Sequence, residues 1–134
     1  MQIGFGFVMT RKRILVVDDD PSTRFLLRLI FETGGYEVIE AQNGIAALIW
    51  IKETLPDIVV TDMMMPVMDG GALIDHLRSH AQTAALPILA ITANPKGKEA
   101  AAKADLVLAK PFDRNQLLAI VESLLAQNES RSDL

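Results

Sequence analysis

The sequence contains no cysteine, and none of its apolar stretches is long enough to cross a bilayer. The first absence excludes a disulfide framework and fits a protein of the reducing cytoplasm. The chain also lacks a concentrated cluster of lysine and arginine, and its net charge is −4 with a pI near 5.1. Non-specific binding to nucleic acid requires a basic surface, so we expect neither a direct nucleic-acid partner nor a membrane partner.

The length and composition fit a single globular domain. The chain has 134 residues, of which 50% are apolar and 22% are charged. A domain of this size buries enough surface to fold without a stabilising disulfide or metal ion. Residues 1–10 carry no charged side chain and are interpreted as a leader, either an extra strand or a disordered segment, with a translation start at Met9 as the alternative. Residues 11–126 hold the domain, and residues 127–134 are a polar tail. No linker, second domain or internal repeat interrupts this order.

Short apolar runs alternate with helical patterns from residue 13 onward. The runs fall at 14–17, 58–60, 88–91 and 106–108 and are typical of parallel strands covered on both faces, while residues 36–40 are predicted as a more polar strand nearer an edge. Helices are predicted after Asp20 and Asn43, which can cap a helix N-terminus, after the loop at 69–71, at 98–103, and after Asp113. Five strands alternating with five helices predict a parallel sheet with helices on both faces.

Apolar residues at three- and four-residue spacing predict which face of a helix is buried. The first helix offers Phe25, Leu26, Leu29 and Ile30, and the second offers Ala46, Ala47, Trp50 and Ile51. The methionines at 63, 64, 65 and 68 are interpreted as adaptable packing rather than as a partner-binding patch. His76 and His80 are interpreted as surface residues, because no third metal ligand lies near them in the sequence.

Polar side chains follow four of the five predicted strands. Asp18 and Asp19 follow the first strand, Asp62 ends the third, Thr92 follows the fourth, and Lys110 follows the fifth. Ligands of parallel α/β sheets bind outside the carboxyl ends of the strands, so we expect all five residues at one edge of the sheet. Asp20 is set apart from them, because the proline that follows it favours a helix cap.

This combination of residues has a chemical logic. Three carboxylates that crowd together raise one another's pKa, and a hard divalent cation such as Mg²⁺ removes that conflict. A carboxylate can also act as a nucleophile on phosphorus and form an aspartyl-phosphate. The transferred phosphoryl group then requires positive charge and hydrogen-bond donors, which Lys110 and Thr92 can supply.

Four segments of the chain resemble the receiver domain of two-component response regulators. They are ILVVDDD (14–20), DIVVTDMMMPVMDGG (57–71), PILAITA (87–93) and LAKPF (108–112), in this order and spacing. The resemblance extends over about residues 11–126. It implies a flavodoxin-like (βα)5 sandwich, with five parallel strands in the order 2-1-3-4-5.

The resemblance also implies roles for the acidic residues. Asp62 would be the phosphoacceptor. Asp18 and Asp19 would hold Mg²⁺, with Mn²⁺ as an alternative, together with Asp62 and the backbone carbonyl of Met64. The phosphoryl group would come from a histidine kinase or a histidine phosphotransfer protein.

Two further residues would complete the site by the same resemblance. Thr92 and Lys110 would contact the phosphoryl group, and the bond between Lys110 and Pro111 would be cis. A phosphorylated chain would then bind an unidentified effector protein, as a monomer or a weak homodimer.

Two features depart from the pattern of that family. Val107 stands three residues before the lysine, where receivers usually carry a tyrosine or phenylalanine whose rotation reports phosphorylation. The segment from Thr92 to Lys110 is several residues shorter than usual, which trims the fourth helix. We therefore expect the residues of the chemistry to be present and the usual readout to be altered.

Two other functions fit parts of the sequence. A Mg²⁺-dependent phosphohydrolase of the haloacid-dehalogenase type also uses a strand-end aspartate, but it requires a second acid two residues later, where this chain has Met64. A degenerate receiver that acts only as a protein-binding module is the other alternative, and the complete set of acids, threonine and lysine argues against it. We expect a single-domain response regulator rather than an enzyme, so that DNA binding and catalysis would take place in another protein.

Overall fold

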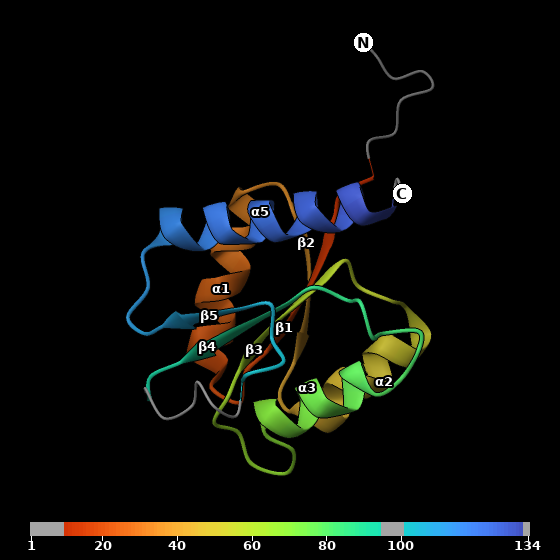
Figure 1. Cartoon of the computed structure of the whole chain (residues 1–134). Coiled ribbons are helices and arrows are strands. Elements are labelled where there is room, and N and C mark those ends of the chain that lie inside the picture. The colour runs from red at the N-terminus through yellow and green to blue at the C-terminus, as the bar shows by residue number, and fades with distance from the viewer. Residues whose placement is uncertain (1–9, 95–100, 133–134) are drawn as a thin grey trace.

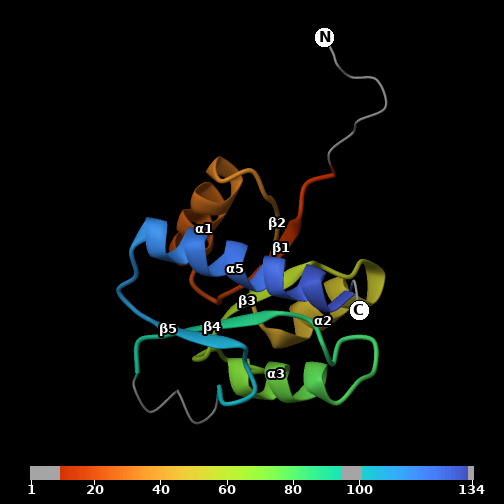
Figure 2. The same ribbon diagram turned by 45° about the horizontal axis from the view of Figure 1, so that its top comes forward.

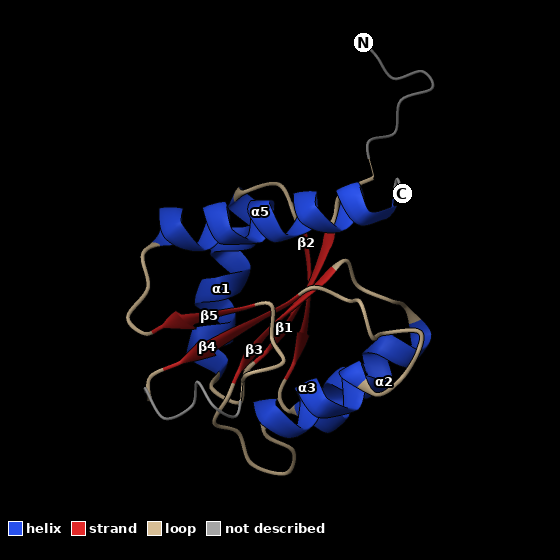
Figure 3. Cartoon of the chain, in the orientation of Figure 1, coloured by secondary structure: helices blue, strands red, loops and turns tan. Residues whose placement is uncertain are grey.

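The computed structural model describes residues 10–94 and 101–132. The strands are β1 (Arg13–Val17), β2 (Glu37–Ala41), β3 (Ile58–Asp62), β4 (Ile88–Thr92) and β5 (Leu106–Ala109), and the helices are α1 (Pro21–Thr33), α2 (Gly44–Glu53), α3 (Gly70–Arg78) and α5 (Arg114–Ser132). Figure 3 shows how the strands gather in the middle of the molecule with the helices outside them. No helix in the described ranges is both long and apolar enough to cross a membrane.

The five strands form one parallel sheet in the order β2-β1-β3-β4-β5, which confirms the predicted fold. Helices α1 and α5 cover one face of this sheet, and α2 and α3 cover the other (Figures 1 and 2). Alternate residues of β1 therefore enter two separate cores. Ile14 and Val16 pack under α1 and α5, while Leu15 and Val17 pack under α2 and α3. Burial on both faces explains why the strands are continuous apolar runs.

Polar caps fix where three of the helices begin. The side chain of Asp20 accepts a hydrogen bond from the backbone N–H of Ser22, and that of Asn43 accepts one from Ala46. Both residues had been predicted as caps. Asp69 starts α3 in the same way, by accepting from the backbone N–H of a residue three positions later. Each cap satisfies a donor that the first helical turn leaves without a partner.

Helix α1 buries a different face from the one predicted. Its buried residues are Leu27, Ile30 and Phe31, whereas Phe25, Leu26 and Leu29 are 60%, 49% and 46% exposed. Six of the seven residues from 25 to 31 are apolar, so their spacing is compatible with more than one buried face. Packing against the sheet selects the face, and it leaves an apolar surface on the outside of α1.

For α2 the prediction was wrong only at Trp50. This helix is apolar nearly all round, and it buries Ala47 while Trp50 lies exposed. The small side chain of Ala47 lets the helix approach the sheet closely, and the bulky indole is turned to the outside. Ala46 and Ile51 are partly buried and pack against the core.

Two segments differ in length from the expectation. Helix α5 continues past Gln127 to Ser132, and an ion pair of 3.0 Å between Lys12 and Glu129 links this last part of the helix to the start of β1. Half of the short helix predicted at 98–103 lies outside the described residues. Residues 101–103, which are described, form a turn.

Candidate phosphoryl-accepting site

The predicted site residues lie at the carboxyl edge of the sheet. Asp18 and Asp19 directly follow β1, Asp62 is the last residue of β3, Thr92 is the last residue of β4, and Lys110 directly follows β5. These four strands are parallel and adjacent, so the polar side chains meet at one edge although they lie up to 92 positions apart in the sequence.

The three acids form a compact cluster. One carboxylate oxygen from each of Asp18, Asp19 and Asp62 lies within 4.8 Å of the others. Asp18 is 2% exposed and Asp62 is 9% exposed, so water compensates little of their charge. Burial raises the pKa of Asp18, and the neighbouring carboxylates add to the rise, against a hydrogen bond from the Asp20 backbone N–H and the charge of Lys110. Such a cluster favours a bound cation.

Lys110 supplies positive charge beside two of the acids. Its Nζ lies 3.6 Å from an oxygen of Asp62 and 3.8 Å from an oxygen of Asp18. The backbone N–H of Lys110 donates to the carbonyl of Thr92 over 2.9 Å, so its position is tied to the end of β4. The bond between Lys110 and Pro111 is cis, as expected. A small anion in front of Asp62 would meet an ammonium group already in place.

The hydroxyl group of Thr92 is buried and already engaged. It donates to the backbone carbonyl of Asn94 over 3.1 Å and accepts from the backbone N–H of the same residue. Thr92 therefore braces the loop after β4 in this structure. If a ligand oxygen accepted a hydrogen bond from Thr92, the Thr92 hydroxyl would have to release the Asn94 carbonyl.

Asp62 is held by its own neighbours in the chain. Its Oδ1 accepts from the backbone N–H of Met63 over 2.8 Å, and the hydroxyl of Thr61 donates to its carbonyl. The start of α3 packs directly behind it: a Cβ at Gly70 would overlap the Asp62 carbonyl oxygen and lie 2.8 Å from the Met63 Cα. Only a glycine permits this approach, which fixes the backbone that presents the carboxylate.

A set of charged residues that was not predicted from the sequence supports Asp18. A guanidinium nitrogen of Arg24 donates to the Asp18 backbone carbonyl over 2.7 Å, and another lies 3.2 Å from Glu40 on β2. Arg28 binds the second oxygen of Glu40 at 2.6 Å. The one sequence signal was the pair of arginines four residues apart on the helix that follows the acids. Their partner on β2 becomes visible only in the fold.

Residues 14–122 match the family model for the response regulator receiver domain. The chain belongs to this family. A curated relative, the DNA-binding dual master transcriptional regulator RpaA of Synechocystis sp., is 36% identical over 121 residues, which cover 87% of this chain and 50% of the relative. The receiver domain described here thus spans about half the length of the curated relatives it matches.

Solved structures agree with this membership. The chemotaxis response regulator CheY4 of Vibrio cholerae is 32% identical, with a TM-score of 0.79 over 86% of this chain and 99% of that chain. The response regulator protein TrrA from Thermotoga maritima, in complex with Mg(2+)-BeF, is also 32% identical, with a TM-score of 0.79 over 84% and 98% of the two chains. The chain is therefore a receiver domain of the two-component type in sequence and in fold.

The loop after β3 carries the last of the predicted metal ligands, the backbone carbonyl of Met64. Met64 lies two residues after Asp62, and its side chain is exposed; the role of its carbonyl stays a prediction. Val67 has a φ of 71°, and the N–H of Met68 donates across it to the Pro66 carbonyl over 2.8 Å. A β-branched residue is strained in this left-handed region, so the loop stores strain next to the acids.

The position that usually carries an aromatic residue in receivers is a partly buried valine here. Val107 lies on β5, between the exposed Leu106 and the buried Leu108. It packs against the core under α2 and α3. A valine at this place has no ring to rotate, so any change read out along β5 must use other side chains.

Proposed function

We propose that this receiver domain is a phosphoryl-accepting switch in a two-component phosphorelay, and that Asp62 is the phosphoacceptor. The observation that carries the proposal is the lysine ammonium 3.6 Å from Asp62, within a cluster of three carboxylates. A structural ion pair alone would not require three acids at one sheet edge. Together they provide a nucleophile, positive charge and oxygen ligands for a cation.

The donor set fits Mg²⁺. Asp18, Asp19 and Asp62 offer hard oxygen ligands within 4.8 Å of one another, and Mg²⁺ typically takes one or two carboxylates with several waters. The backbone carbonyl of Met64 is a further proposed ligand, and Mn²⁺ is an alternative ion. When bound, the cation would neutralise the acids and the phosphoryl oxygens. The related TrrA structure, which is a complex with Mg(2+)-BeF, supports this assignment.

The proposed reaction requires the phosphodonor and the bound cation, and no other group from outside the chain. A carboxylate oxygen of Asp62 attacks phosphorus, an O–P bond forms, and the bond from phosphorus to the leaving group breaks with its electron pair. For a phosphohistidine donor the leaving group is the imidazole. The ammonium group of Lys110 neutralises negative charge on the phosphoryl oxygens. The Thr92 hydroxyl releases the Asn94 carbonyl and then donates a hydrogen bond to one of these oxygens. This exchange of hydrogen-bond partners would transmit phosphorylation to the loop after β4.

The donor's docking surface is proposed on α1. This helix starts beside Asp18 and Asp19, and Phe25, Leu26 and Leu29 on its outer side are exposed. An exposed apolar group of this kind marks a protein-interaction surface. A histidine kinase or phosphotransfer protein docked there would bring its phosphohistidine to the edge that holds Asp62. This surface does not identify the effector protein, and the region matched in the relative RpaA is 50% of that protein.

Phosphorylation by a small donor tests the proposal. The full chain is incubated with Mg²⁺ and acetyl phosphate, and its intact mass is followed with time. We expect one added phosphoryl group, its absence in Asp62→Asn, and its presence in the control Asp75→Asn, whose carboxylate lies outside the site. Rapid turnover of phosphate esters would favour the hydrolase, and neither adduct nor Mg²⁺ binding would favour the degenerate receiver. As a further check, the Lys110→Ala variant should still bind Mg²⁺, but its phosphorylation should not alter its binding to a partner.

A further inference from the structure

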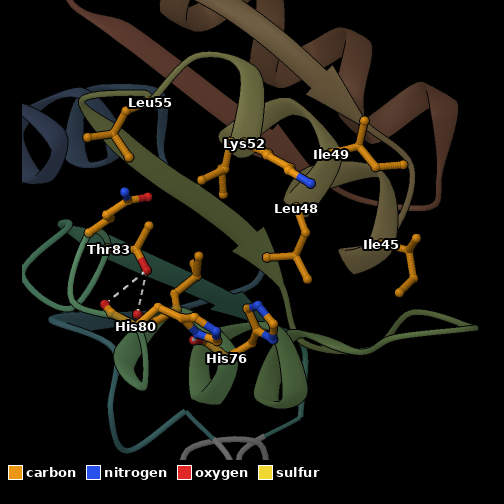
Figure 4. A pocket seen from close by; sticks show the side chains of 11 residues that line it. Ile45, Leu48, Ile49, Lys52, Leu55, His76, His80 and Thr83 are labelled. Carbon is orange, nitrogen blue, oxygen red and sulfur yellow. Dashed lines mark hydrogen bonds between the residues drawn. The ribbon is translucent and has the colours of Figure 1, made fainter.

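A groove of about 850 Å³ runs between α2 and α3. Figure 4 shows Ile45 at one end and Leu55 at the other, with Leu48 and Ile49 between them along α2. The side chains from α2 recur at the three- and four-residue spacing that places them on one face of a helix. Trp50, on the same helix, is not part of the lining. The groove therefore follows one face of α2 along its length.

The α2 wall of the groove is apolar and open to solvent. Ile45, Ile49 and Leu55 are 43%, 61% and 53% exposed. A pocket for a small molecule encloses most of its ligand, whereas walls exposed to this degree would leave much of such a ligand in water. Contiguous exposed apolar side chains instead mark a surface that binds another protein.

The groove favours an occupant that satisfies its own backbone. None of the five strands contributes a residue to the lining, so the described part of the chain offers no strand edge there to which an extended peptide could add. The hydroxyl of Thr83 is already engaged, because it donates to the Leu77 carbonyl over 2.6 Å. A helix bonds its N–H and C=O groups internally, and one of about ten residues would match the length of α2, about 15 Å.

The charge along the groove has one sign. Lys52 is exposed on the α2 wall and forms no ion pair with the described residues. The opposite wall carries His76 and His80, whose rings stack at 4.3 Å between their centres and can add only positive charge. Neither Glu53 nor Asp75, the acids beside them in the sequence, is part of the lining. In a chain with a net charge of −4, such a groove favours an acidic partner.

We propose that the groove between α2 and α3 binds an amphipathic helix of a partner protein, with acidic residues beside its apolar stripe. Apolar side chains of that helix at i, i+3, i+4 and i+7 pack on Ile45, Leu48 and Ile49, and a carboxylate pairs with Lys52. The groove lies on the face of the sheet opposite α1 (Figures 1 and 2), so a phosphodonor on α1 would not block it. The inference does not require phosphorylation of Asp62.

Titration with helical peptides tests the proposal. Three peptides of about 15 residues, long enough to form a helix, share a leucine stripe at i, i+3, i+4 and i+7. They differ only in the flanking residues, which are glutamate, glutamine or lysine. Each carries a fluorophore, and its anisotropy is followed as the full, unphosphorylated chain is added. We expect saturable binding, with the glutamate peptide about fivefold tighter than the glutamine peptide and the lysine peptide weakest. General attraction to an acidic chain would give the opposite order.

Substitutions assign the binding to the groove. Ile49→Ser should weaken binding of the glutamate peptide about tenfold, whereas Trp50→Ser, on the same helix but outside the lining, should leave it unchanged. Lys52→Glu should weaken binding of the glutamate peptide and strengthen binding of the lysine peptide. Arg114→Glu, an exposed control at the start of α5 with the same change in net charge, should alter both by less than about twofold. The urea midpoint of each variant checks that it is folded.

Three results would overturn the proposal: no saturable binding of the glutamate peptide, the reverse order of the three peptides, or equal binding to Ile49→Ser. Sedimentation of the chain alone examines the other occupant. A dimer that dissociates in Ile49→Ser would assign the groove to a second copy of the chain and would also overturn the proposal. Each of these results would leave phosphorylation of Asp62 unaffected, because the titrations contain no phosphodonor.

Discussion

Replacing Asp18 with asparagine removes one charge from the centre of the site and keeps the size of the side chain. Asp18 is 2% exposed, and one of its oxygens accepts from the Asp20 backbone N–H over 2.9 Å. An asparagine oxygen can keep that bond. The change therefore isolates the cost of a buried negative charge in the absence of a cation.

The size of the effect follows from the surrounding charges. In a medium of effective dielectric 20, Lys110 at 3.8 Å from Asp18 attracts its carboxylate by about 4 kcal/mol. Asp62, within 4.8 Å, repels it by at least about 3.5 kcal/mol, and the exposed Asp19 adds a smaller repulsion. These terms nearly cancel, which leaves the desolvation of the carboxylate, several kcal/mol for a buried ion, against about 1–3 kcal/mol for the neutral amide that replaces it. Asp18→Asn should therefore raise the free energy of unfolding by about 1–3 kcal/mol.

Urea unfolding at neutral pH measures this in EDTA and again with excess Mg²⁺. In EDTA the variant should be the more stable protein, with a higher urea midpoint and, in thermal unfolding, a melting temperature about 4 °C higher per kcal/mol. With Mg²⁺ at 100 times its dissociation constant, the wild type should gain about 2.7 kcal/mol, and the variant should gain much less. The difference seen in EDTA should therefore shrink or change sign.

The pH dependence has a definite direction. Burial raises the pKa of Asp18 in the folded state above its ordinary value of 3.8, so the folded protein is destabilised as pH rises through that raised pKa. The advantage of Asp18→Asn in EDTA should thus be present at neutral pH and vanish as pH falls toward 3.8. Asp75→Asn is the matched control, because this carboxylate is exposed and lies outside the site, so its loss should change stability little. A variant that is less stable than the wild type in EDTA would refute the reasoning.

Two further substitutions test the supports of the site. Gly70→Ala should lower the free energy of unfolding by about 1–3 kcal/mol, because its Cβ would lie 2.8 Å from the Met63 Cα; an unchanged urea midpoint would contradict the close packing behind Asp62. Arg24→Lys keeps the charge but loses one of the two contacts that join Asp18 to Glu40, so Mg²⁺ affinity by calorimetry should fall about tenfold. An unchanged dissociation constant would show that Arg24 does not position Asp18.

The sequence predicted the site better than it predicted the helix faces. Asp62 follows an apolar run that cannot continue past a charge and a proline, so its place at a strand end was visible. Parallel strands then put Asp18, Thr92 and Lys110 at the same edge without any knowledge of contacts. In α1, by contrast, apolar residues surround the helix, and their spacing could not tell that Ile30 is buried while Leu29 is exposed.

Other features of the structure had little or no local signal in the sequence. The contact from Arg24 to the Asp18 carbonyl, with Glu40 on its other side, joins a helix to two strands. The exposed groove along α2 depends on how far α3 lies from it. Val67 looks like any loop residue until its backbone is seen in the left-handed region.

The sequence by itself therefore determined the order of strands and helices, the caps at Asp20 and Asn43, and the edge at which the acids, threonine and lysine meet. These follow from local patterns and from the single direction that parallel strands share. The tertiary structure alone decided which helix faces are buried, how close Lys110 comes to Asp62, and which surfaces stay open. Those properties depend on distances between segments far apart in the chain, and packing sets such distances while residue spacing does not.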